Sequence, residues 1–184
     1  MVGDDAVGGA ALRDEQVARL VEEVDRARDP LRAKRLMEAL VLARSDADAG
    51  GAPTLERTRR WQGLVLGAPT GFRTRPALAH AGAVRYGLER DTEALFAASM
   101  EQASDPLVPA ISRAARAHLD VCYFHPFADG NGRAARLALD FVLTQAGLGL
   151  HAAGPVFLVA RRAGDPGGAF GFMHIIDYLT GPIA

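Results

Sequence analysis

The chain has little of several residue types on which whole classes of proteins depend. Cysteine occurs once in 184 residues, at Cys122, which excludes an internal disulfide and a multi-cysteine metal site and favours a reducing, cytoplasmic compartment. Lysine also occurs once, at Lys34, so a Walker A nucleotide site, which needs a lysine after its glycines, is excluded. No apolar run approaches the ~20 residues of a membrane helix, and the opening residues lack the basic start of a secretion signal.

An excess of positive charge is also missing. Lys and Arg together number 21 against 22 Asp and Glu, which gives a net charge of −1 at pH 7. A broad basic surface for nucleic acid is therefore not expected, and any phosphate chemistry must be local. We expect a soluble cytoplasmic protein with no nucleic-acid and no membrane partner.

The chain does contain enough apolar sequence for one globular domain. Hydrophobic residues make up 49% of it, and helical periodicity dominates after a glycine-rich opening. We expect a flexible N-terminus over 1–11 and a single domain over 12–184. The predicted helices span 12–29, 31–44, 55–66, 92–102, 106–124, 132–145 and 170–179. Residues 67–87, broken by Gly and Pro, predict a loop or small β-hairpin, and 154–164 predict a strand or a buried turn of helix. The predicted fold class is all-α, a helical bundle with one small hairpin.

One segment, HPFADGNGRAAR at 125–136, carries the candidate chemistry. Gly130 and Gly132 let the backbone turn with converging N–H groups and leave no side chain in the way of a ligand. The helix that follows adds unpaired N–H groups and the positive end of its dipole, which makes the junction an anion site. Arg133 and Arg136 lie three residues apart on that helix and can both reach the anion. The segment therefore predicts a polyphosphate cradle.

Three further side chains of this segment add to the cradle. Asp129 is its only acid, and a single carboxylate can hold Mg²⁺ whose other ligands are phosphate oxygens and water. His125 is its only side chain that accepts a proton near neutral pH, so it is the candidate general base. Phe127 is expected to point into the core and anchor the loop. Taken singly, such residues more often have structural roles, but their combination in one segment favours a functional interpretation.

Other interpretations of the segment are weaker. Residues 130–135 formally match a dinucleotide-binding fingerprint, G-x-G-x-x-A, but they follow a predicted helix instead of a strand. The acid that should bind the ribose about 20 residues further on is missing. Paired Cys/His spacing for zinc does not occur either.

The segment resembles the signature of the Fic/Doc family of enzymes, HxFx(D/E)GNGRxxR, at all eight specified positions. The resemblance implies an all-helical core and transfer of a nucleoside monophosphate, most often AMP from ATP, to a hydroxyl side chain of a target protein (AMPylation). Pyrophosphate is the other product. It also implies a β-hairpin flap at about 69–87, which would align the target by main-chain pairing.

The family's pattern assigns a role to each matching residue. His125 would deprotonate the attacking Ser, Thr or Tyr hydroxyl, and Asp129 would hold Mg²⁺ on the α- and β-phosphates. Arg136 would meet the γ-phosphate. The anion hole would consist of the backbone of Gly130, Asn131 and Gly132 together with Arg133.

Two details refine this hypothesis. The phosphorylating branch of the family departs from the pattern at the glycines and at Arg133, all present here, so nucleotidyl transfer is favoured over kinase activity. Many members carry an inhibitory helix, (S/T)xxxE(G/N), but no glutamate of this chain precedes Gly or Asn. We expect inhibition by a separate antitoxin-like protein, with an uninhibited enzyme or an unusual substrate as alternatives. The competing hypotheses for the activity are another nucleotide donor, a small-molecule acceptor, and a non-catalytic nucleotide-binding module.

Overall fold

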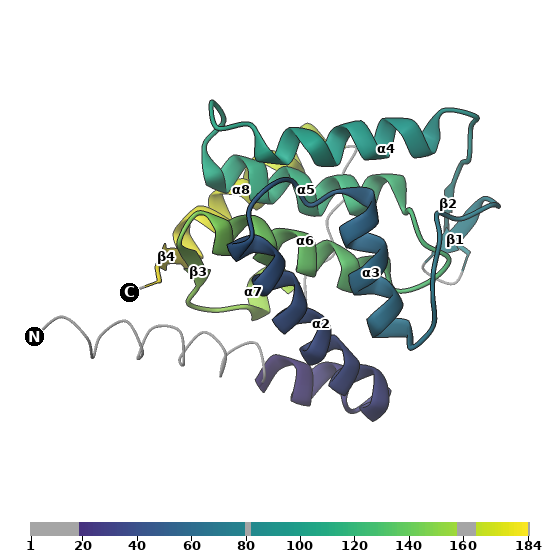
Figure 1. Cartoon of the computed structure of the whole chain (residues 1–184), viewed down its shortest axis with the longest axis horizontal. Helices are drawn as coiled ribbons and strands as arrows, with labels where there is room; N and C mark the ends of the chain where they lie inside the picture. The colour runs from purple at the N-terminus through teal and green to yellow at the C-terminus, as the bar shows by residue number, and fades with distance from the viewer. Residues whose placement is uncertain (1–18, 80–81, 158–164, 184) are drawn as a thin grey trace, which may run out of the picture.

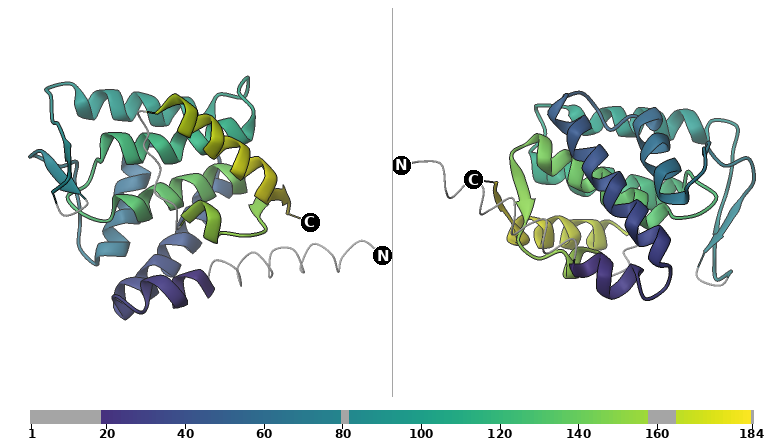
Figure 2. Two further views of the ribbon diagram at one scale, coloured as in Figure 1. Left: turned by 180° about the vertical axis from the view of Figure 1, so that it is seen from behind. Right: turned by 60° about the horizontal axis from the view of Figure 1, so that its bottom comes forward.

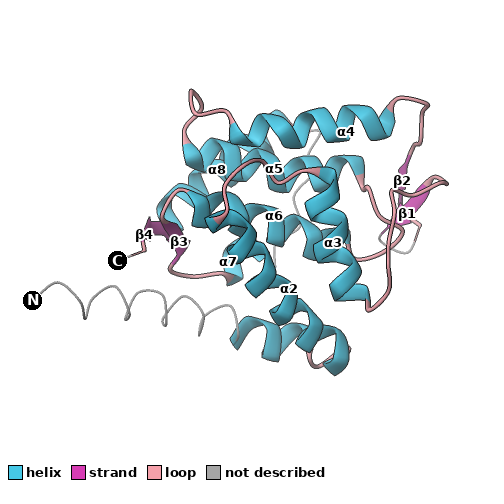
Figure 3. Ribbon diagram, in the orientation of Figure 1, coloured by secondary structure: helices cyan, strands magenta, loops and turns pink. Residues whose placement is uncertain are grey.

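The computed structural model describes residues 19–79, 82–157 and 165–183, which form a helical bundle with two short antiparallel sheets (Figures 1 and 3). The helices are η1 (Val21–Asp25), α2 (Pro30–Asp48), α3 (Leu55–Leu66), α4 (Thr92–Glu101), η2 (Gln102–Ser104), α5 (Ala110–Phe124), α6 (Asn131–Gln145), α7 (Gly154–Phe157) and α8 (Pro166–Leu179). The strands are β1 (Ala77–Ala79), β2 (Val84–Tyr86), β3 (Leu148–Leu150) and β4 (Thr180–Pro182). The predicted all-α class is thereby confirmed, while the N-terminus 1–11 lies outside the described residues. Within them, no helix combines the length and the apolar character needed to span a membrane.

Helix α6 lies at the centre of the bundle (Figure 1). Ten of its fifteen residues are buried, among them Phe141 and the charged Asp140. A helix buried on all sides needs partners on all sides, and α5, α2 and α3 supply them. The ring of Trp61 in α3 is fully buried and lies 5.3 Å from the Phe141 ring. Asp140 forms an ion pair with Arg44 of α2 at 2.9 Å. The core thus holds α6 in place, with its first residues free to form part of a site.

The N-terminal helices differ from the prediction at their ends. The first predicted helix, 12–29, is described only from residue 19 and ends in η1, because the chain turns before Asp29. The Asp29 side chain then caps α2 by accepting a hydrogen bond from the amide of Arg32 at 3.0 Å. Pro30 occupies the first helical position, where the missing N–H leaves no bond unmade. Helix α2 continues beyond the predicted end at residue 44, to Asp48.

The prediction that α5 starts at Pro106 is wrong, since the helix starts at Ala110. The Asp105 carboxylate accepts a hydrogen bond from the Leu107 amide at 2.9 Å, but this closes only an isolated turn. Pro109 explains the delay. A proline disfavours helical backbone in the residue before it, and Pro109 itself is extended, with ψ at 140°.

The C-terminal elements also begin or pair differently from the prediction. Helix α8 starts at Pro166 instead of residue 170, because the Asp165 side chain caps it by accepting from the Gly167 amide at 3.1 Å. Strands β3 and β4 pair although the sequence did not predict them, since three residues are too few for alternation to show. Of 154–164, the part that is described forms α7, a helical turn in which Val156 is buried and Pro155 is exposed, and 158–164 lie outside the described residues.

Strands β1 and β2 form the predicted hairpin, which projects from one end of the bundle (Figure 2). They pair antiparallel, with Ala77 opposite Tyr86 and Ala79 opposite Val84. The hairpin leaves the bundle beside the point where α5 ends and the loop to α6 begins (Figure 1). It is called the flap below, together with the residues from Phe72 to Gly87 that lead into and out of it.

Candidate functional site

His125 ends α5 in a left-handed backbone conformation. Its φ is 50° and its ψ is 55°, and it is the one non-glycine residue in the described part of the chain with a positive φ. This conformation closes a helix well but costs a non-glycine residue about 1–2 kcal/mol. The amide of His125 donates to the carbonyl of Val121 at 3.0 Å, and the ring of Tyr86 stacks on the imidazole at 4.0 Å. The candidate base is therefore held both by the helix end and by the flap.

Two buried side chains hold the loop between α5 and α6. Asn131 bonds across it: Oδ1 accepts from the amide of Phe127 at 2.9 Å and Nδ2 donates to the carbonyl of the same residue at 2.8 Å. Gln62 of α3 donates from Nε2 to the Asp129 carbonyl at 2.6 Å. Gln62 and Phe127 are fully buried. The loop therefore has its shape before any ligand binds, which is what anion stabilisation by a backbone requires.

The first turn of α6 leaves amides for a ligand. The helical ladder begins with the amides of Arg133 and Ala134 donating to the Gly130 carbonyl at 2.9 and 3.1 Å. The amides of Asn131 and Gly132 precede the ladder, at the end of the helix where anions bind. A Cβ built on Gly132 would meet no atom within 4 Å, so the space in front of it is open. This geometry fits the predicted cradle.

Gly130 is required by the packing as well as by its backbone. Its φ is +75°, and a Cβ built there would lie 2.3 Å from Gln62 Nε2. We expect Gly130→Ala to lower the free energy of unfolding by about 2–4 kcal/mol, from the left-handed strain and the disrupted bond between Gln62 and the loop. Urea unfolding measures this change in the free energy of unfolding. In the matched variant Gly132→Ala the added methyl group would lie in open space. This variant should change the free energy of unfolding by less than about 1 kcal/mol. Equal losses in the two variants would contradict the role given to Gly130.

The two arginines of the segment converge on a carboxylate that the sequence analysis did not identify. Asp25 of η1, 4% exposed, accepts from Arg133 Nε at 3.0 Å and from Arg136 Nη1 at 3.3 Å. Arg136 also donates to the Phe157 carbonyl at 2.9 Å. Burial lowers the pKa of Arg136, and the neighbouring Asp25 acts in the opposite direction. A carboxylate of the chain itself thus occupies the arginine pair that was predicted to bind phosphate.

Asp129 lies at the surface of the loop. Its side chain is 60% exposed, with Oδ2 at 2.8 Å from Arg32 Nη1, while Oδ1 accepts from the Gly130 amide at 2.6 Å. Among the described residues, no group of three His, Cys, Asp or Glu side chains could enclose a metal ion. The chain offers one carboxylate at this point, which fits Mg²⁺ only together with phosphate oxygens and water as the other ligands.

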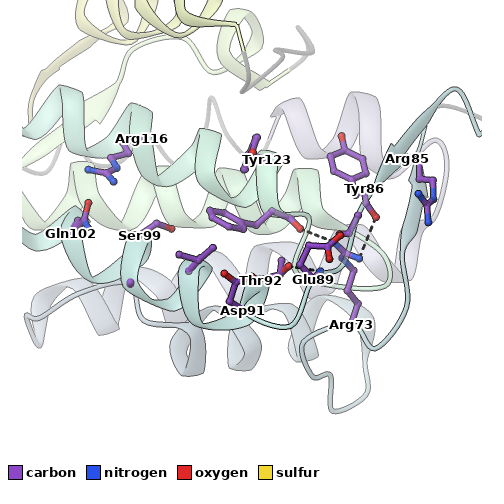
Figure 4. A pocket seen from close by; sticks show the side chains of 14 residues that line it. Arg73, Arg85, Tyr86, Glu89, Asp91, Thr92, Ser99, Gln102, Arg116 and Tyr123 are labelled. Atoms are coloured by element: carbon purple, nitrogen blue, oxygen red, sulfur yellow. Dashed lines mark hydrogen bonds between the residues drawn. The ribbon is translucent and has the colours of Figure 1, made fainter.

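A cleft of about 760 Å³ lies between α4, α5 and β2. Tyr86 stands at one end, and Arg116 and Gln102 lie toward the other (Figure 4). Its walls carry both signs of charge, Arg85 and Arg116 against Glu89 and Asp91, in addition to the apolar surface of Leu95 and Phe124. Tyr86, which lines this cleft, stacks on the ring of His125, which does not line it.

Two other titratable groups at this end of α5 stay protonated at neutral pH. Burial raises the pKa of the Cys122 thiol to about 11, so the one cysteine of the chain is a poor nucleophile. Burial also raises the pKa of Tyr86 above its ordinary value. Neither side chain competes with His125 for the role of base.

Comparison with known proteins agrees with this geometry. Residues 54–143 match the model of the Fic/DOC family, from the cap of α3 through the flap to the end of the buried part of α6. The fold is similar to that of a Fic domain-containing signaling protein from Bacteroides thetaiotaomicron VPI-5482, with 21% identity and a TM-score of 0.64 over 81% of this chain and 67% of that one. A Fic family protein from Desulfovibrio desulfuricans G20 has 15% identity and a TM-score of 0.54, over 91% of this chain and 53% of that one. The chain thus spans about half the length of the second protein.

Proposed function

Because residues 54–143 match the model of the Fic/DOC family, we propose that the chain is an enzyme of this family and transfers AMP from ATP to a Ser, Thr or Tyr hydroxyl of a target protein. One observation carries this proposal: a histidine and an anion-binding helix start are the two ends of one short loop whose shape buried side chains fix. A base and a phosphate site held in a constant relation are what an in-line displacement at phosphorus needs. A module that only binds nucleotide has no use for a base there.

The proposed reaction uses the residues of the site as follows. His125 takes the proton from the attacking hydroxyl, whose oxygen forms a bond to the α-phosphorus. The bond from the α-phosphorus to the oxygen bridging to the β-phosphate breaks, and pyrophosphate leaves with that oxygen. The amides of Asn131 and Gly132 and the guanidinium of Arg133 stabilise the charge on the phosphates. Arg136, one turn further along α6, accepts the γ-phosphate.

Asp129 is the residue that would hold Mg²⁺. The ion would offset the negative charge of the phosphates and shares that task with the arginines. Asp129 pairs with Arg32 in the structure, so the ion would compete with this guanidinium for the carboxylate.

The acceptor would approach from the flap side. An extended segment of the target can pair with a free edge of the β1–β2 hairpin, and the cleft beside Tyr86 has room for the side chains around the acceptor. Asp25 pairs with both Arg133 and Arg136, so it would compete with phosphates for them. The antitoxin-like inhibitor expected from the sequence would therefore act on arginines that are already paired.

The test supplies ATP labelled at the α- or at the γ-phosphate, with Mg²⁺, to the purified protein and to a cell lysate that provides acceptors. We expect the α-label to stay on protein and the γ-label to leave as pyrophosphate. The His125→Asn variant is the control, because asparagine tolerates the left-handed conformation. Retention of the γ-label would mean phosphorylation, and retention of neither label, with bound nucleotide, would mean a binding module. Repeating the assay with the other nucleoside triphosphates identifies the base that is used.

A further inference from the structure

Arg73, in the segment that leads into the flap, is 6% exposed and surrounded by backbone. Its guanidinium donates five hydrogen bonds, all of them to carbonyl oxygens. Figure 4 shows Arg73 beside Tyr86 and Glu89 in the cleft. The acceptors belong to Arg75 at 2.9 Å, Tyr86 at 3.4 Å, Gly87, Phe124 at 3.2 Å and His125 at 2.8 Å. Its amide also donates to the Pro126 carbonyl at 2.8 Å.

These bonds use the full capacity of the side chain. A guanidinium carries five N–H donors in a planar fork, and each has a carbonyl partner here. Burial of the charge is costly and lowers the pKa of Arg73. An arginine in this place is difficult to explain by surface solubility or by a surface ion pair.

The carbonyls come from two parts of the molecule. Those of Arg75, Tyr86 and Gly87 belong to the two ends of the hairpin. Those of Phe124 and His125 are the last of α5, where a helix leaves its carbonyls without helical partners and where positive charge is favourable. Arg73 therefore caps α5 and closes the base of the flap with one side chain.

The same cluster sets the direction of the candidate base. The carbonyl that Arg73 Nε holds belongs to His125 itself, whose backbone is in the left-handed conformation. Arg73 Nη1 also donates to the carbonyl of Tyr86, in β2. The planes of the Tyr86 and His125 rings differ by only 14°. Arg73 and Tyr86 therefore join the base of the flap to His125.

The geometry points to Arg73 as a positioning residue that locks the flap to the His125 turn, with Tyr86 as the contact to the ring. This inference rests on the proposed function: when a segment of the target pairs with the flap, its acceptor hydroxyl is already aligned with the His125 imidazole. A misplacement of about 1 Å at the reacting atoms costs about a hundredfold in rate. The lock thus serves catalysis more than binding.

Arg73→Lys tests the lock, because lysine keeps the charge but has three donors on one atom and cannot span both groups of carbonyls. Arg59→Lys is the matched control: Arg59 donates to the Thr70 carbonyl at 3.3 Å, near the start of the same connection, and lies outside the site. Hydrogen exchange is followed in peptides covering 84–87, 121–127 and 134–143. We expect exchange in the first two to rise together, by about tenfold or more, with the third unchanged and the control like wild type.

The second measurement is the rate of labelled transfer. We expect kcat of Arg73→Lys to fall by about ten- to a hundredfold, with KM for ATP changed less than about twofold. Should Arg73→Lys not fold, Tyr86→Ala leaves the buried guanidinium in place, and its kcat should fall by about tenfold with KM for ATP again unchanged.

Three outcomes would overturn the inference: exchange that rises in only one of the two segments, loosening of both without loss of kcat, or a loss confined to KM for ATP. If the wild-type protein transfers no label, the proposed function fails while hydrogen exchange still decides whether Arg73 locks the flap to α5.

Discussion

Asp25→Ala should bind ATP about tenfold more tightly than the wild-type protein, a gain of about 1.4 kcal/mol. Asp25 bridges Arg133 and Arg136, and its side chain is 6% exposed. It competes with phosphates for these arginines, so its removal takes away a competitor. Calorimetric titration with MgATP measures the change.

The same substitution should destabilise the empty protein. Removing one partner of a buried ion pair leaves the other charges uncompensated, and here two arginines face each other without their carboxylate. We expect the free energy of unfolding to fall by about 2–4 kcal/mol, with much of the loss recovered when MgATP is present.

Asp140→Ala is the matched control for Asp25→Ala. Asp140 is equally buried and pairs with Arg44 at 2.9 Å in the core, away from the segment that binds the anion. It should lose comparable stability without any change in ATP affinity. Identical ATP affinities in all three proteins would mean that the triphosphate does not bind at the arginine pair, and the assignment of Arg133 and Arg136 would fail.

His125→Gly should abolish transfer and leave stability almost unchanged. Loss of a general base costs about 10²–10⁴-fold in rate. Two opposing terms act on stability: glycine removes the left-handed strain of about 1–2 kcal/mol, and the lost stacking with Tyr86 costs about 0.5–1.5 kcal/mol. The net change should therefore stay within about 1 kcal/mol.

His125→Ala separates these terms. Alanine keeps the strain and loses the stacking, so it should be less stable than His125→Gly by about 1 kcal/mol. Both variants should bind ATP like the wild type. Activity above about a tenth of the wild-type rate in either variant would exclude His125 as the base, and loss of ATP binding in both would give it a structural role instead.

The part of the site that the sequence predicts is the part that is local. The loop and the start of α6 are formed by consecutive residues, and their pattern of glycines, acid and arginines describes the geometry directly. The residues it misses act over long separations: Asp25 meets Arg133 108 positions away, Gln62 meets Asp129 67 away, and Arg73 meets His125 52 away. Each is a polar side chain that periodicity would place at the surface. Only the packing of η1, α3 and the flap against the loop buries them.

Helix starts show the same division between local and distant causes. The dipeptide Asp-Pro occurs at 29–30, 105–106 and 165–166, and the first and third begin a helix whereas the second does not. The difference is Pro109, which follows the second and has no counterpart in α2 or α8. Capping residues thus indicate where a turn starts, and the residues that follow decide whether a helix grows from it.

The cluster at the start of α6 has an electrostatic imbalance: two guanidinium groups surround a single carboxylate. Even while Asp25 is in place, the cluster has a surplus of positive charge at a point where the helix dipole adds more. A dissolved polyanion is therefore attracted over distances comparable with the Debye length, and its arrival slows as ionic strength rises. Binding of a polyanion therefore has two steps. The rate of the first, its approach to the cluster, depends on ionic strength, and the rate of the second depends on how fast the ion pairs of Asp25 with the arginines break.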